Sequence, residues 1–207
     1  MTYKTEQELF WSGEFGDDYS KRNIGVEWIA SNTAFFSKIL GNTRDINTVL
    51  EFGSNIGLNL RALSHLLPHA QLSAVEINTQ AVNELQNWGR LEHIYHESIL
   101  DFDPNDKIWD LTFIKGVLIH INPNELFSVY EKLYRSSSRY VLIAEYYNPS
   151  PVEVVYRGHE GRLFKRDFAG EILDQYKDLH LVDYGFVWHR DPNFPQDDIT
   201  WFLLEKR

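Results

Sequence analysis

The sequence predicts an α/β protein built on a single doubly wound, Rossmann-like sheet of seven strands, mostly parallel with an antiparallel last strand. Three observations predict this fold. Short apolar segments alternate with amphipathic helical segments along most of the chain. A glycine-containing turn joins the first such strand to the helix after it, and a short, turn-rich link joins the last two strands. Alternating strands and helices indicate a parallel sheet covered on both faces, whereas the short link indicates an antiparallel pair.

The composition limits both the architecture and the partners. The chain has 207 residues, a formal charge of −10 and no cysteine, which indicates one domain over residues 1–207 without disulfides or thiolate chemistry. The acidic charge argues against nucleic-acid and anionic membrane partners. The histidines show no metal-ligand spacing, so no metal is expected. No apolar stretch reaches the roughly 20 residues of a membrane span, and the first residues lack the apolar core of a secretory signal, which predicts a cytoplasmic protein.

The first half of the predicted sheet follows a helical leader. Aromatic residues at helical spacing over residues 1–40 predict a helical N-terminal lid, and residues 41–207 form the core. Residues 48–52 and 71–77 are the first two strands. The helix between them has an apolar stripe of leucines and ends at Pro68, and residues 79–88 form the next helix.

The second half continues the alternation. Residues 94–96 are a weak third strand, and residues 110–114 are a nearly all-apolar fourth strand. A helix is expected to begin after Asn122 as its N-cap, with Pro123 in its first position and Glu125 completing a capping box. Residues 140–145, 179–188 and 199–204 are the remaining strands, and residues 148–170 form an insertion after the fifth strand.

The turn after the first strand has the composition of a ligand-binding loop. Gly53 and Gly57 let backbone amides approach a ligand at the start of a helix. A dinucleotide fingerprint needs further glycines where this chain has Asn55 and Leu58. Glu51 would repel a pyrophosphate but suits a ligand with an ammonium and a sulfonium, which points to S-adenosylmethionine (SAM).

A second carboxylate supports the same ligand. Glu76 ends the second strand 19 residues after Gly57, at the position from which a carboxylate accepts hydrogen bonds from ribose hydroxyls. The alternative is that Glu51 and Glu76 are merely solvated strand ends.

At these motifs the chain resembles the class I SAM-dependent methyltransferases. In the resemblance Glu51, Gly53 and Gly57 match the acid-x-Gly-x-x-x-Gly motif, and Glu76 matches the ribose-binding acid. Residues 97–99 look like the adenine contact, and residues 113–121 look like the loop that borders the transferred methyl. The cofactor implied is SAM, with S-adenosylhomocysteine (SAH) as product. The expected cofactor-binding residues are Tyr19, Arg22, Glu51, Gly53, Ser54, Asn55, Gly57, Glu76, Ile77, Ser98, Ile99, Lys115 and Gly116.

A narrower resemblance concerns the acceptor. From Trp11 to Glu205 the chain resembles the pseudaminic acid biosynthesis-associated methylases, with particular motifs at residues 10–19, 51–57 and 164–168. This resemblance implies an acceptor that is a sugar acid or a nucleotide-linked sugar in surface-glycan biosynthesis.

Residues 19–23 could close over the cofactor. Arg22 could then pair with the methionine carboxylate through a forked, charge-assisted bond. The alternative is that Arg22 is a surface charge on a helix.

The insertion reverses the sign of the local charge. Five basic side chains face one acid, Glu160, within ten residues. Loops at the carboxyl ends of strands line the crevice of such a sheet, so the insertion is expected to bind an anionic small molecule, the alternative being a solvated basic loop. The basic residues are Arg157, His159, Arg162, Lys165 and Arg166, and Tyr146 and Tyr147 are expected to line the pocket.

Methyl transfer requires mainly that the nucleophile and the methyl be aligned. A hydroxyl acceptor would gain from a base of near-neutral pKa, for which His120 and His159 are the candidates. A neutral amine acceptor needs no base. The residues leave open O- or N-methylation, a homodimer, and two other functions: an NAD-dependent oxidoreductase and a non-catalytic cofactor-binding regulatory protein.

Overall fold

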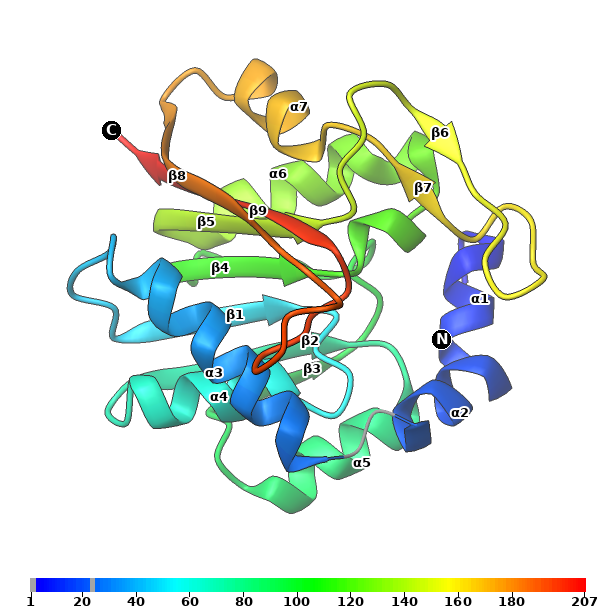
Figure 1. Cartoon of the computed structure of the whole chain (residues 1–207), viewed down its shortest axis with the longest axis horizontal. Helices are drawn as coiled ribbons and strands as arrows, with labels where there is room; N and C mark the ends of the chain where they lie inside the picture. Colours follow the sequence, from blue (N-terminus) through cyan, green and yellow to red (C-terminus); the bar gives the residue numbers. More distant parts are fainter. Residues whose placement is uncertain (1–2, 23–24) are drawn as a thin grey trace.

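The structure is a computed structural model that describes residues 3–22 and 25–207 (Figure 1). Its main sheet has seven strands in the order β3-β2-β1-β4-β5-β9-β8. Strand β9 pairs antiparallel with both β5 and β8, and the other neighbours are parallel. The predicted fold class is therefore confirmed. The strands are β1 (Thr48–Phe52), β2 (Gln71–Glu76), β3 (His93–His96), β4 (Trp109–Lys115), β5 (Ser137–Glu145), β8 (Leu179–Val187) and β9 (Ile199–Lys206).

The strand order creates a crevice at one edge of the sheet. The chain runs outward from β1 to β2 and β3, and then returns to the other side of β1 to form β4. The connections after β1 and β4 therefore leave the sheet on opposite faces, which opens a space at the carboxyl ends of these strands. The functional site is built in this space.

Helices cover both faces of the sheet. Consecutive strand residues such as Val49 and Leu50 are both fully buried but belong to cores on opposite faces, as expected for a central parallel strand. One core includes side chains of α3, α4 and α5, and the other includes side chains of α6 and α7. These helices are α3 (Val26–Leu40), α4 (Leu58–Leu66), α5 (Thr79–Trp88), α6 (Leu126–Ser136) and α7 (Phe168–Gln175).

The N-terminal region contains two different parts. Helices α1 (Glu6–Ser12) and α2 (Glu14–Arg22) lie beside the carboxyl ends of the strands (Figure 1). In contrast, α3 packs Phe35, Phe36 and Ile39 into the core, so it is a layer of the fold although it lies within the 1–40 segment expected to be a lid. Asn23, in the expected closing segment, lies outside the described residues.

Some local elements differ from the sequence-based expectation. Asn122 accepts a bond from the amide of Asn124, but this bond caps a 3-10 turn, and α6 begins only at Leu126. Glu125 forms no side-chain cap of α6, so the predicted capping box was wrong. The insertion also holds a two-stranded sheet that was not predicted, formed by β6 (Val152–Glu153) and β7 (Phe164–Lys165). Among the described helices, none is long and apolar enough to cross a membrane.

Candidate functional site

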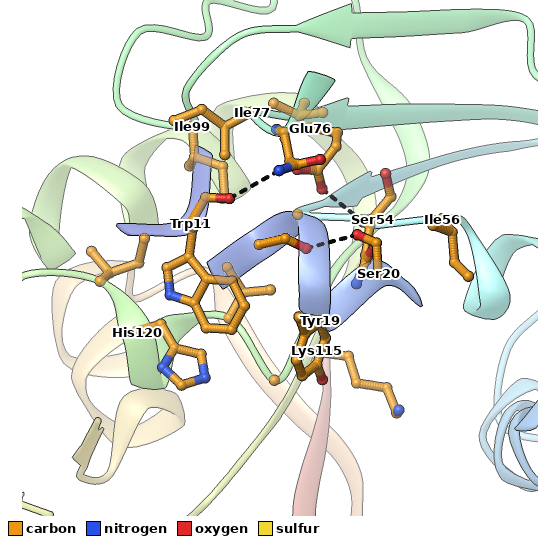
Figure 2. Close-up of a pocket in the computed structure, with 18 of the residues that line it drawn as sticks. Trp11, Tyr19, Ser20, Ser54, Ile56, Glu76, Ile77, Ile99, Lys115 and His120 are labelled. Carbon is orange, nitrogen blue, oxygen red and sulfur yellow. Dashed lines mark hydrogen bonds between the residues drawn. The ribbon is translucent and has the colours of Figure 1, made fainter. Parts of the chain in front are cut away.

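A cavity opens at the carboxyl ends of β1, β2 and β4, and α1 and α2 form one of its walls (Figure 2). Most of the residues expected to bind the cofactor line it, although they come from segments far apart in the chain. Glu51, Gly57 and Arg22 are not among its lining residues. The expected residues that line the cavity are Tyr19, Gly53, Ser54, Asn55, Glu76, Ile77, Ser98, Ile99, Lys115, Gly116 and His120.

The loop after β1 needs glycine at two positions. Gly53 and Gly57 have φ angles of 73° and 78°, in the left-handed region. A Cβ atom on Gly53 would lie 2.7 Å from a methyl carbon of Val117, and one on Gly57 would lie 2.6 Å from a methyl carbon of Leu85. Close packing and backbone conformation thus both require the two glycines.

Glu76 is held by the backbone at the end of β2. Its two carboxylate oxygens accept hydrogen bonds from the amides of Asn55 and Asn78, each at 2.7 Å. Burial raises the pKa of Glu76, and the amide bonds oppose that shift by stabilising the ionised form. Each oxygen has a second lone pair, so Glu76 can accept further donors from a molecule in the cavity.

Glu51 lies fully buried on β1 behind the loop. Its Oε1 accepts a hydrogen bond of 2.6 Å from Asn59 Nδ2. Burial raises the pKa of Glu51 to about 8, against the opposing influence of Asn59 and the Lys115 ammonium. Lys115 lines the same cavity, and its own pKa is lowered by burial.

Three buried oxygen atoms in the β1–α4 segment have no hydrogen-bond partner among the described residues. They are Glu51 Oε2, Ser54 Oγ and Asn59 Oδ1. Ser54 and Asn59 line the cavity, and Glu51 is bonded to Asn59. Unpaired buried polar atoms are costly, so this group favours a ligand that brings several N–H donors.

Polar bonds attach α1 and α2 to the strand ends. Asn78 caps α5 with its Oδ1 and donates from Nδ2 to Asp17 Oδ1 at 2.8 Å and to the Trp11 carbonyl at 3.3 Å. Ser20 Oγ donates to Asn55 Oδ1 at 2.7 Å, and Figure 2 shows this bond beside the loop. These bonds hold α2 and the end of α1 against the loop after β1 and the start of α5.

Tyr19 and Arg22, both expected to bind the cofactor, lie in different surroundings. Tyr19 lines the cavity, as Lys115 does (Figure 2). Arg22 is exposed, and its guanidinium lies 5.7 Å from the ring centre of Phe15. Lys115 is thus the cation that lines the cavity in the described residues, and Arg22 is not.

His120 lies at the cavity in a fixed orientation. It belongs to the 3-10 turn η1 (Leu118–His120), and its Nδ1 donates to the Arg162 carbonyl at 2.6 Å. Its ring packs against Trp11 and Tyr156, with ring centres 4.6 and 4.9 Å away. Burial lowers the pKa of His120 to about 4. The ring is therefore neutral at pH 7, with a lone pair on Nε2.

The basic insertion packs against α1 and α2, and two of its five basic side chains are paired with carboxylates. Arg162 pairs with Glu6 at 3.2 Å, and Arg166 pairs with Glu171 at 2.6 Å. The exposed ring of His159 packs against Phe10, 5.1 Å away between ring centres, and Arg157 is exposed. These side chains do not form one anion-binding cluster, and none of the four lines the cavity.

A second hollow lies at the ends of β5, β8 and β9. Three of the expected acceptor-binding residues, Tyr146, Tyr147 and Lys165, line it. Its other lining residues are Phe186, His189, Asp197, Asp198 and Thr200, and Asp197 also lines the first cavity. The sequence did not single out His189 and Asp198, because their pairing depends on a turn-rich connection with no recognisable motif.

Within residues 3–22 and 25–207, no cluster of three or more His, Cys, Asp or Glu side chains could hold a metal.

The comparisons with known proteins agree with this architecture. No protein-family model and no curated protein sequence matches the chain. Its fold is similar to the plantazolicin methyltransferase BpumL in complex with SAH, with 15% identity, a TM-score of 0.67 and coverage of 97% of this chain and 94% of that one. The DhpI–SAH complex gives 18% identity, a TM-score of 0.64 and coverage of 97% and 96%. A SAM-dependent methyltransferase from Leishmania major gives 13% identity, a TM-score of 0.68 and coverage of 98% and 82%. At these identities the similarity shows a shared fold.

Proposed function

We propose that the protein is a SAM-dependent methyltransferase that transfers a methyl group to an oxygen or nitrogen of a small anionic acceptor. The unpaired buried oxygens of Glu51, Ser54 and Asn59 carry this proposal. The methionine end of SAM bears an ammonium with three N–H donors, which suits such a group of acceptors. NAD brings no ammonium to this loop, so it would leave these buried oxygens unpaired.

The remaining lining residues fit the rest of SAM. Lys115 can pair with the methionine carboxylate, and Glu76 can accept bonds from the ribose hydroxyls. Ile77 and Ile99 provide apolar surface for the adenine, and Ser98 lines the same part of the cavity with its hydroxyl donated to Glu8. The similarity to structures described as SAH complexes supports the same assignment. When bound, SAM supplies a methyl group activated by the sulfonium.

The chain itself aligns the reactants and excludes water. Helices α1 and α2 cover the cavity through their bonds to Asn78 and Asn55, so the donor is shielded from solvent. Neutral His120 faces the cavity with Nε2 free to accept a proton or orient an acceptor. Since methyl transfer depends mainly on alignment, such a preorganised cavity contributes much of the rate.

The acceptor we propose is a sugar acid or a nucleotide-linked sugar. The resemblance to the pseudaminic acid biosynthesis-associated methylases supports it, and so does Lys165 in the second hollow. Arg157, in the same insertion as Lys165, is exposed. Arg162 and Arg166 are instead paired with Glu6 and Glu171. Tyr146 and Tyr147 add aromatic surface on which a sugar ring can pack.

Calorimetry with SAH, 5′-methylthioadenosine and NAD⁺ tests the cofactor. SAH is expected to bind, and 5′-methylthioadenosine, which lacks the amino-acid end, is expected to bind at least about tenfold more weakly. Glu51→Gln should weaken SAH but leave 5′-methylthioadenosine almost unchanged, because the unpaired Glu51 Oε2 belongs to the oxygen group proposed to accept from the ammonium, which 5′-methylthioadenosine lacks. Tighter binding of NAD⁺ than of SAH would contradict the proposal and favour an oxidoreductase. SAH binding without methyl transfer to any sugar acceptor would favour a regulatory protein.

A further inference from the structure

The second hollow contains a histidine held by a carboxylate. His189 Nδ1 lies 2.8 Å from both carboxylate oxygens of Asp198, and the His189 amide donates to Asp198 Oδ1 at 3.0 Å. These bonds lower the pKa of Asp198, so the carboxylate is ionised and can only accept. Nδ1 must therefore carry the proton, which leaves the lone pair on Nε2.

The backbone supports this arrangement. Asp198 has a φ angle of 45°, a left-handed conformation that is uncommon outside glycine but is tolerated by Asp. The connection between β8 and β9 is also anchored, since Gln196 Nε2 donates to Asn32 Oδ1 of α3 at 2.9 Å in a buried bond. In Figure 1 this connection, in dark orange and red, lies beside α3. Residues 196–198 are therefore held between the sheet and a core helix.

The two spaces meet at one residue. Asp197 lines both the cofactor cavity and the hollow, and it directly precedes Asp198. Burial raises the pKa of Tyr146 and lowers that of Lys115, and the Asp197 charge acts on both groups by favouring their protonated forms, so Asp197 lies within electrostatic reach of both sites. An acceptor in the hollow is thus adjacent to the donor cavity.

The lining of the hollow indicates its ligand. Three aromatic side chains, Tyr146, Tyr147 and Phe186, stand beside two carboxylates and one ammonium. Lys165 Nζ lies 5.1 Å from the ring centre of Tyr146. Aromatic rings pack against the C–H faces of a sugar, carboxylates accept from its hydroxyls, and a lysine pairs with an anionic group.

We propose that this hollow binds the acceptor, a polyhydroxylated ring with an anionic group, and that His189, positioned by Asp198, is the general base. This inference rests on the proposed methyltransferase function. The acceptor oxygen forms a bond to the methyl carbon, and the carbon–sulfur bond breaks with its electron pair remaining on sulfur. The hydroxyl proton passes to His189 Nε2, and the resulting imidazolium is stabilised by the Asp198 carboxylate.

His120 is less suited to this step. It is almost fully buried, and burial lowers its pKa to about 4, so it takes up a proton reluctantly. His189 is about half exposed to solvent, and its Nδ1 is held by the Asp198 carboxylate. Lys165 is the opposing positive charge in the hollow.

A binding experiment tests the ligand. UDP-glucuronic acid is titrated by calorimetry into SAH-saturated protein. Lys165→Gln should weaken binding about tenfold, because a charge-assisted bond is lost, and the exposed control Lys177→Gln should stay within about twofold. No binding of UDP-glucuronic acid, or equal affinity in both variants, overturns the assignment. Failure of SAH itself to bind identifies a failure of the proposed function instead.

A kinetic experiment tests the base, with SAH formation measured in the presence of SAM and UDP-glucuronic acid. His189→Gln should lower kcat about 10²–10⁴-fold while the SAH affinity is unchanged. Asp198→Asn removes the charge that stabilises the imidazolium, so the acidic limb of its pH profile should move to lower pH. Full activity of His189→Gln, or the absence of turnover in the parent protein, overturns the proposal.

Discussion

The cofactor cavity and the second hollow lie side by side but are built differently. The cavity is formed at strand ends, where backbone amides hold Glu76 and the fold buries Glu51 completely. The hollow is formed by the end of β5, a short β-strand pair and the β8–β9 connection, and its His189 and Asp198 are about half exposed. The difference indicates that a space built from strand ends can be fixed by the fold itself, whereas a hollow lined by loop residues depends on the particular side chains of those loops.

The largest expected effect concerns the cavity. Glu76→Ala removes an acceptor for two ribose hydroxyls, so SAH affinity should fall on the order of 10²-fold. The exposed Glu92→Ala serves as a matched control and should bind SAH like the parent. Calorimetry gives the affinities, and thermal unfolding shows that both variants are folded. An unchanged SAH affinity of Glu76→Ala would show that this carboxylate does not bind the ligand. The contrast between the cavity and the second hollow would then be wrong.

The second effect tests the rigidity of the loop after β1. Gly57→Ala should lower the free energy of unfolding by about 2 kcal/mol, because the added Cβ meets Leu85 and the φ angle is left-handed. Gly41→Ala is the control, since Gly41 has a φ angle of −58° and should be neutral or slightly stabilising. Urea unfolding measures both. Equal stability of the two variants would mean that the loop adapts easily and is not fixed by the fold.

Another effect, measured as stability and not as affinity, is a pH dependence that arises from Glu51 behind the loop after β1. The pKa of Glu51 in the folded protein is about 8, above its unfolded value, so the folded state binds the proton more tightly. The free energy of unfolding of the ligand-free protein should therefore fall as pH rises from about 4.5 to 8, by about 1.4 kcal/mol per unit of pKa difference. Burial also raises the pKa values of Glu145 and Glu76, so both residues make the free energy of unfolding fall as pH rises.

The Glu51→Gln variant isolates the Glu51 contribution, since it should show a flatter dependence of stability on pH. SAH binding should show the opposite trend in the parent, because its ammonium favours the ionised carboxylate and affinity should rise toward pH 8. Parallel stability curves for the parent and Glu51→Gln would contradict the raised pKa. Chemical denaturation at several pH values provides the measurement.

The smallest effect concerns the basic insertion. Arg166→Gln should lower the free energy of unfolding by about 1 kcal/mol, because Glu171 loses its half-buried partner, and should leave SAH affinity unchanged. Lys177→Gln, at an exposed pair, should have little effect on stability. Loss of UDP-glucuronic acid binding in Arg166→Gln at unchanged stability would instead make the arginine part of the acceptor site.

The sequence by itself determined the sheet and the residues that gather where its first two strands end. Buried strands appear as continuous apolar segments, and helix starts and stops are local, so the order of elements follows from short-range patterns. Gly53, Gly57 and Glu76 could be assigned for the same reason, because a strand-to-helix turn and the end of the next strand always meet at one edge of a parallel sheet.

Only the tertiary structure decided which charges remain available. It paired Arg162 with Glu6 and Arg166 with Glu171, and it joined His189 to Asp198, nine positions later in the chain. It also placed α3 in the core and left Glu51 Oε2 unpaired. Backbone preference and apolar periodicity act between neighbours in the chain, whereas an ion pair depends on the distance in space between side chains, which is set only when the chain has folded.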